Sequence, residues 1–411
     1  MEIEYILRDF GLILGAGLVS QLIARIIRLP EMIVLVAMGA LIGPSILGLV
    51  ANPLGSVGSQ LLFNIGVALI LFHGGVGISL RVISKTAVGL GLLVLPGVLL
   101  TALIVALAVA PVFGVALPIA LMVGAVLAAT DPAILIPLFE RIKLRPKVSQ
   151  TVIAESAFND PVGTVLTLTV AGVVSSGHFT VSGPALDFGR ELVLGTLIGV
   201  GAGLILAVLV ASSARIGIWD EAPGVAILAV VALVYFSNEA LHGSGYLAAF
   251  VMGLIVGNMD EFKLGQSEEH GKLLEDFAAQ TAQIATLLVF VTLGLNLPFD
   301  ALGKYFFGGL IIMAVFIFVA RPVAVLACLL PDRRGQWTWK EIIFLSWCRE
   351  TGVVPAAVGA LLLADKVPGA QLAVSMVALA VCATLLLQAT TAGFVASKLG
   401  LIEDGNSDTS G

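Results

Sequence analysis

Charged residues are scarce in this sequence. Only 12% of its 411 residues are Asp, Glu, Lys or Arg, about half the roughly 25% that is usual in soluble domains. Hydrophobic residues make up 59%, and the mean hydropathy is +1.09. So few charges cannot cover the surface of a water-soluble protein of this size, because most of that surface would be apolar. The composition therefore excludes a soluble globular protein and predicts a polytopic membrane protein.

Cysteine and net positive charge are lacking as well. Three cysteines, Cys328, Cys348 and Cys382, lie in apolar runs, where cysteine behaves as a small buried hydrophobic residue. This excludes a secreted disulfide-stabilised scaffold. A formal net charge of −6 offers no basic surface for nucleic acid. No Gly-rich phosphate loop ends in Lys-Ser or Lys-Thr, so the sequence predicts no ATP site.

What the sequence has in abundance is apolar runs. A bilayer core needs about 20 apolar residues per helix, and these runs lack the polar–apolar alternation of membrane β-strands. The predicted fold class is an all-α polytopic membrane protein with about 13 transmembrane helices. The runs cover residues 10–28, 30–50, 59–79, 86–111, 115–139, 147–175, 189–213, 221–240, 242–258, 275–297, 302–330, 340–363 and 369–397.

Lys and Arg residues are unevenly divided between the two sides of this arrangement. With the N-terminus outside, fifteen of the 21 fall on the cytoplasmic side and four on the outer side. The other two, Arg321 and Arg349, lie inside apolar runs. Cytoplasmic loops carry an excess of these residues. We therefore expect a multi-pass protein of the cell membrane with its N-terminus outside and a short polar cytoplasmic tail at 398–411.

The fifth run is interrupted near its middle by Thr130, Asp131 and Pro132. Proline cannot donate a backbone hydrogen bond, and its ring opens the preceding turn. Free backbone groups at this depth are tolerated only where they line a cavity or pack on protein, and ionisable groups there are expensive and usually functional. The pattern predicts a broken helix at a functional site, with a capped proline kink as the alternative.

The sixth run holds the densest group of polar residues, namely Glu155, Ser156, Asn159 and Asp160. Residues four apart share a helical face, so Ser156 lies with Asp160, and Glu155 lies with Asn159. Oxygen ligands suit hard cations, and no nearby Cys or His suggests zinc or copper. We predict a cation site here. The alternatives are a structural polar cluster for Asp160 and an ion pair with an arginine for Glu155.

The twelfth run is interrupted as well. Arg349 and Glu350 are followed by Gly352 and Pro355, which loosen the backbone. Runs five and twelve lie seven runs apart, so their orientations in the membrane are inverted. Paired discontinuous helices in inverted halves are typical of the binding site of a secondary transporter. The other buried arginine, Arg321, is expected to bond neighbouring carbonyls or to extend toward the interface.

These motifs resemble those of the monovalent cation/proton antiporters. The similarity is greatest to the branch of the NhaP-type prokaryotic exchangers and the animal sodium/hydrogen exchangers. It covers nearly the whole chain and implies the sodium/proton antiporter fold, with inverted repeats and two broken, crossing helices. It is carried by Thr130-Asp131-Pro132, by Glu155-Ser156 with Asn159-Asp160-Pro161, by Gly243–Ala248 and by Gly253–Asn258.

The resemblance implies roles for the polar residues of runs five and six. Asp160 matches the carboxylate that binds the cation and exchanges the proton, and Asn159 matches the asparagine of electroneutral members. Ser156 and Glu155 match groups near the bound Na⁺, and Thr130 would contribute its main-chain carbonyl. The implied Na⁺ site is thus Asp160, Ser156, Glu155 and Thr130.

The resemblance also implies supporting roles in the same domain. Asp131 matches the aspartate that steadies the crossing of the broken helices, and Arg349 matches the arginine of the twelfth helix. Glu350 stands where the family usually has glycine, which alters the local charge balance. We expect Arg349 to form an ion pair with Glu155, because it is the nearest cation at similar depth.

Members of the family are dimers, which implies a division of this chain. Residues 1–80 and 221–297 would form a dimerisation domain, and 86–176 and 302–397 a mobile core. Residues 189–213 would be a linker helix. No cofactor is expected beyond the transported ions.

The predicted function is exchange of a monovalent cation for H⁺ by alternating access, electroneutral with one proton per cation. Removal of a carboxylate from water disfavours its charged form. Either a proton or a cation can stabilise the buried carboxylate, so the two ions compete for it. Sodium is favoured, with lithium accompanying it, and a K⁺/H⁺ antiporter of the same fold is the alternative. A cation channel is less favoured because no filter-like loop is found. An intramembrane hydrolase using Asp131 and Asp160 is less favoured because proline follows each aspartate.

Overall fold

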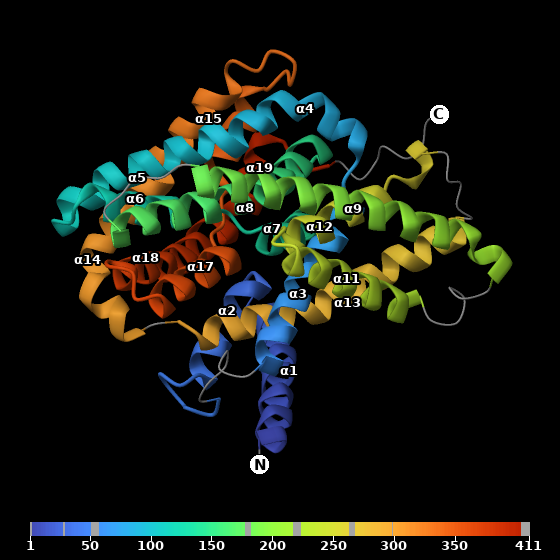
Figure 1. Ribbon diagram of the computed structural model, residues 1–411, viewed down its shortest axis with the longest axis horizontal. Coiled ribbons are helices and arrows are strands. Elements are labelled where there is room, and N and C mark those ends of the chain that lie inside the picture. The colour runs from blue at the N-terminus through green and yellow to red at the C-terminus, as the bar shows by residue number, and fades with distance from the viewer. Residues whose placement is uncertain are drawn as a thin grey trace. The chain divides into compact units, whose positions relative to one another are not determined.

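The computed structural model describes residues 2–27, 29–50, 57–176, 182–216, 223–262, 268–297 and 299–403. These residues are almost entirely helical (Figure 1). Within these described ranges, eight helices are long and apolar enough to cross a membrane, and five shorter apolar helices accompany them. The predicted class, an all-α polytopic membrane protein, is confirmed, while the number of spans stays a prediction.

The helices fall into two compact units, each built from two separated stretches of chain. Unit 1 comprises residues 1–80 and 180–299, and unit 2 comprises residues 81–179 and 300–411. All the candidate site residues named above lie in unit 2. The predicted linker, 189–213, lies within unit 1.

Unit 1 is held together by close helix packing at glycines. In the second predicted run, only the first part is helical, because Gly43 and Pro44 end the helix after Ile42. Gly253 packs against the carbonyl of Phe72, and such small residues allow helix backbones to approach closely. The helices of unit 1 are α1 (Glu2–Ile27), α2 (Glu31–Ile42), α3 (Val57–Val76), α9 (Ser182–Ile216), α11 (Pro223–Ala240), α12 (Gly245–Val256), η2 (Met259–Phe262) and α13 (Glu268–Leu295).

Unit 2 contains the first interrupted and π-distorted helices of the chain. Its first stretch forms α4 (Leu80–Leu92), η1 (Leu93–Gly97), α5 (Val98–Phe113), α6 (Leu117–Ala128), α7 (Pro132–Ile142) and α8 (Pro146–Ser176). The segment η1 is a π-helix that contains Pro96 and leaves the α4–α5 helix continuous. Such π segments inside helices often mark functional sites.

The second stretch of unit 2 repeats these features. Two further π-helical segments, η3 and η4, lie inside continuous helices. The helices are α14 (Phe299–Val315), η3 (Phe316–Ala320), α15 (Arg321–Leu329), α16 (Trp339–Trp347), α17 (Val353–Ala364), α18 (Ala370–Ala383), η4 (Thr384–Ala389) and α19 (Thr390–Leu399).

Both predicted interruptions are confirmed. Helix α6 ends at Ala128, and α7 begins at Pro132, with Asp131 as its N-cap. The Asp131 Oδ1 accepts a hydrogen bond from the Ala133 N–H at 2.8 Å, which satisfies one of the free donors at a helix start. Helices α16 and α17 are separated by residues 348–352. By contrast, α8 continues through Pro161.

The predicted tail begins later than expected. Lys398 and Leu399 still belong to α19, and the next residues pair with the loop between α7 and α8. The Arg145 N–H donates to the Leu401 carbonyl, and the Glu403 N–H donates to the Lys143 carbonyl, both at 2.9 Å. The remaining residues of the predicted tail, 404–411, lie outside the described residues.

The α5–α6 contact in unit 2 gives a direct test of the packing. A Cβ atom at Gly124 would overlap the carbonyl oxygen of Ala102 on α5. We expect Gly124→Ala to lower the free energy of unfolding by about 1–3 kcal/mol, because overpacking displaces the backbone. Gly172→Ala on α8 is the matched control, since its Cβ would meet nothing within 4 Å. Denaturation of the purified protein in detergent measures both, and equal stability of the two variants would contradict the packing.

Candidate ion-binding site

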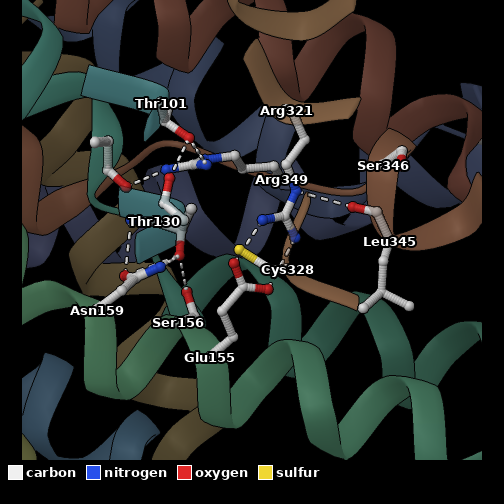
Figure 2. Close-up of polar contacts among 12 residues, drawn as sticks. Thr101, Thr130, Glu155, Ser156, Asn159, Arg321, Cys328, Leu345, Ser346 and Arg349 are labelled. Carbon is white, nitrogen blue, oxygen red and sulfur yellow. Dashed lines mark hydrogen bonds and ion pairs between the residues drawn. The ribbon is translucent and has the colours of Figure 1, made fainter. Parts of the chain in front are cut away.

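The first interruption of unit 2 faces the polar stretch of α8. The Thr130 hydroxyl lies 2.7 Å from the Ser156 hydroxyl and accepts a hydrogen bond from the Asn159 side-chain amide at 2.8 Å. The Thr130 backbone N–H donates to the Asn159 Oδ1 at 3.2 Å (Figure 2). All three residues are buried. The structure therefore brings together Thr130, Ser156 and Asn159, three of the residues that the family resemblance selects.

Asp160 follows directly on the same helix and lies one turn beyond Ser156. Its side chain is buried, and its Oδ1 has no hydrogen-bond partner among the described residues. Buried polar atoms almost always have a partner, so an exception needs an explanation such as a bound ion, a proton or water. The Asp160 carboxylate thus has a free oxygen, on the helix that also carries Ser156 and Asn159.

The two interruptions of unit 2 meet each other. The Asp131 N–H donates to the backbone carbonyl of Glu350 at 3.1 Å. The Arg349 guanidinium donates to the Ala128 carbonyl and to the Thr101 hydroxyl (Figure 2). Ala128 is the last residue of α6, where carbonyls lack helical partners and the helix dipole is negative. The Arg349 side chain therefore compensates the broken end of α6, and Asp131 caps the start of α7.

The expected ion pair between Glu155 and Arg349 is wrong. Glu155 instead binds Arg321, the first residue of α15, through two contacts, one from each terminal nitrogen. Arg321 Nη1 lies 2.5 Å from Oε1 and Nη2 lies 2.9 Å from Oε2 (Figure 2). The Arg321 Nε donates to the Leu345 carbonyl at 2.9 Å. The sequence therefore correctly predicts that Arg321 bonds a carbonyl, but it does not predict Glu155 as its carboxylate partner.

The geometry explains this exchange of partners. A guanidinium fork matches a carboxylate in the plane, and both Arg321 and Glu155 are almost wholly buried, with side-chain exposures of 2% and 3%. Arg349 is already engaged at the end of α6. The available signal in the sequence was that Arg321, like Arg349, is an arginine inside an apolar run.

The second interruption is held by residues that the sequence analysis did not select. In the last helix of unit 2, Gln388 donates through its side-chain amide to the Trp347 carbonyl at the end of α16. The Thr384 hydroxyl accepts from the Thr351 N–H at 3.3 Å. Both Thr384 and Gln388 lie in η4. Glu350 is fully buried, and its two carboxylate oxygens each lie 3.5 Å from the Cys348 Sγ.

Taken together, two crossing broken helices beside a buried carboxylate and an oxygen-lined cluster define a secondary ion transporter. Comparison with known proteins gives the family. The sodium/hydrogen exchanger transmembrane family matches residues 12–398, and this chain belongs to it. The predicted family is confirmed.

Individual relatives agree with this assignment. The Na(+)/H(+) antiporter 1 of Methanocaldococcus jannaschii is 30% identical, over 97% of this chain and 97% of that protein. The K(+)/H(+) antiporter NhaP of Alkalimonas amylolytica is 29% identical, over 84% of this chain and 58% of that protein. A solved structure of the sodium proton antiporter MjNhaP1 from M. jannaschii at pH 8 has a TM-score of 0.77 at 27% identity, covering 98% of this chain and all of that one. The predicted antiporter fold is therefore confirmed.

Proposed function

We propose that this protein exchanges Na⁺ for H⁺ across the membrane and that Asp160 is the group that binds both ions. The observation that carries the proposal is the free Oδ1 of the buried Asp160, next to the hydroxyl–amide cluster of Thr130, Ser156 and Asn159. The family and its Na(+)/H(+) relatives support sodium as the cation.

The proposed ligands are the oxygen atoms of Asp160 and of the cluster that can turn toward a bound ion. Asp160 supplies the negative charge, and Ser156 and Thr130 supply neutral oxygens, with the Thr130 main-chain carbonyl at the unwound segment. Asn159 orients Thr130 through hydrogen bonds with its backbone N–H and its hydroxyl. Both oxygens of Glu155 are bound by Arg321, so Glu155 supports the site by joining α8 to α15.

Exchange follows from the free energy of the buried carboxylate. An ionised carboxylate without a partner is strongly disfavoured in a low-dielectric surrounding. A proton or a Na⁺ relieves this penalty, and each excludes the other from the same group. Only the proton-loaded and the cation-loaded forms then change the side to which the site opens, so movement of one ion is coupled to movement of the other.

Unit 2 is proposed to be the mobile core, and unit 1 the dimerisation domain of a homodimer. Unit 1 exposes large apolar side chains along α1, including Leu18, Leu22 and Ile26, which suit a lipid or a partner surface. The N-terminus is proposed to lie outside and the C-terminus in the cytoplasm, on the strength of the Lys and Arg distribution.

Purified protein in proteoliposomes tests the function. A pH gradient is imposed, and its dissipation is followed with a pH-sensitive dye after addition of Na⁺, Li⁺, K⁺ or Rb⁺ at several pH values. Na⁺ and Li⁺ are expected to dissipate the gradient. A larger response to K⁺ and Rb⁺ would favour the K⁺/H⁺ alternative, which the Alkalimonas relative exemplifies. No response to any of the four would overturn the proposal.

The number of exchanging carboxylates predicts the stoichiometry. Glu155 is held by Arg321 and Asn159 is neutral, so Asp160 alone in this cluster is free to bind a proton. One H⁺ should therefore move for each Na⁺, and no net charge should cross. We expect the Na⁺-driven rate to be unchanged when valinomycin and a K⁺ gradient impose a membrane potential. A current on a solid-supported membrane that reverses with the Na⁺ gradient would contradict this prediction.

A further inference from the structure

Glu350 is a buried carboxyl group that the proposed exchange does not use. It lies between α16 and α17, its side chain is 0% exposed, and its backbone carbonyl accepts the Asp131 N–H at the crossing of the two interruptions. Both side-chain oxygens lie 3.5 Å from the Cys348 Sγ. They are thus next to a thiol, which is only a weak hydrogen-bond donor.

The charged groups around Glu350 compensate it only in part. Arg321 attracts Glu350 electrostatically, but no ion pair joins them among the described residues. Arg321 on α15 is occupied by Glu155 of α8 and by the Leu345 carbonyl. Arg349, its neighbour in the chain, is directed to the Ala128 carbonyl and to Thr101. The adjoining α6–α7 interruption contributes a further carboxylate, Asp131. In the described part of the chain, no Lys, Arg or His forms an ion pair with Glu350.

An ionised Glu350 would therefore be a buried charge with no ion-pair partner of its own in the described structure, since Arg321 is already bound to Glu155. The free energy of such a charge is unfavourable by several kcal/mol even after relaxation, and a buried carboxyl escapes it by keeping its proton. The arrangement of Cys348, Arg321 and Glu155 seen here thus suits a neutral Glu350 carboxyl.

We propose that Glu350 is a second proton-binding site of the core, separate from the cation site, and that loss of its proton slows exchange. The reaction is a simple dissociation in which the carboxyl O–H bond breaks and the proton passes to water. The carboxylate left behind competes with Glu155 for Arg321 and so loosens the link between α8 and α15. This effect on exchange rests on the proposed function, whereas proton binding by Glu350 does not.

Infrared spectroscopy of the full chain in lipid detects the proton itself. The Asp160→Asn variant removes the signal of the exchanging carboxyl and serves as the reference protein. Its spectrum should contain the C=O stretching band of a protonated carboxylic acid, and this band should fade as the pH rises. The band should be missing when Glu350→Gln is added to the reference protein. Asp365→Asn, which removes an exposed carboxyl after α17, should leave the band unchanged.

The possible results separate the two parts of the proposal. Identical spectra with and without Glu350 would show that it is ionised, which overturns the proton site. A band that persists at every pH would support a neutral acid and overturn its release. In transport, the alkaline decline of the wild-type rate should be weaker in Glu350→Gln, each protein being compared with its own rate at neutral pH. If no cation supports exchange in the wild type, the proposed function fails while the infrared result still decides the state of Glu350.

Discussion

Replacement of Asp160 by asparagine is expected to reduce Na⁺/H⁺ exchange to the level of liposomes without protein. Asparagine has nearly the same shape but neither binds a proton nor carries a charge, so it removes the group for which the two ions compete. Because the Asp160 Oδ1 has no hydrogen-bond partner in the described structure, the variant loses no bond at that atom. Its thermal stability should therefore remain close to that of the wild type.

The measurement combines dissipation of a pH gradient in proteoliposomes with a thermal melt of the same preparation. Asp365→Asn provides the control, because it removes an exposed carboxyl of the same type and should leave the rate unchanged. Exchange at the wild-type rate in Asp160→Asn would remove Asp160 from the mechanism. An inactive protein that also fails to fold would instead show that Asp160 has a structural role.

The interruptions of the helices were predictable because their causes are local. Pro132 cannot continue the hydrogen bonding of α6, and Asp131 caps the helix that follows. The meeting of Ser156 and Asn159 with Thr130 was predictable in part, since helical spacing places neighbouring polar residues of α8 within one short stretch. The inverted broken helices and the family resemblance indicate which helix lies opposite that stretch.

The ion pairing was not predictable, because it depends on which helices of unit 2 meet. Arg349 is adjacent to the second interruption, and only its crossing with α6 shows that the Ala128 carbonyl is the nearer acceptor. Arg321 comes to Glu155 from α15, which follows the π-helical segment η3. Hydropathy does not indicate such segments, since a π turn leaves the composition of an apolar run unchanged while it alters which side chains face the neighbouring helices.

Loss of the Glu155–Arg321 pair is expected to have the largest effect on stability. Both partners are almost wholly buried, so removal of one leaves an uncompensated charge within the core. Glu155→Gln and Arg321→Ala should each lower the free energy of unfolding by about 3–5 kcal/mol. For comparison, Arg8→Gln removes the pair with Asp9, in which the two side chains are 49% and 24% exposed, and should change the free energy of unfolding by about 0–1 kcal/mol.

A double-mutant cycle separates this pair from its rivals. If Glu155 and Arg321 bind each other, the double variant should be less destabilised than the sum of the two single variants, because no isolated charge remains. The combination of Glu155→Gln with Arg349→Ala should show a smaller coupling, since these residues attract each other electrostatically but have different hydrogen-bond partners. Chemical denaturation in detergent provides the four free energies for each cycle. Should Glu155→Gln be as stable as the wild type while Glu350→Gln unfolds, Arg321 would have Glu350 as its partner, and Glu155 would become free to bind a second proton.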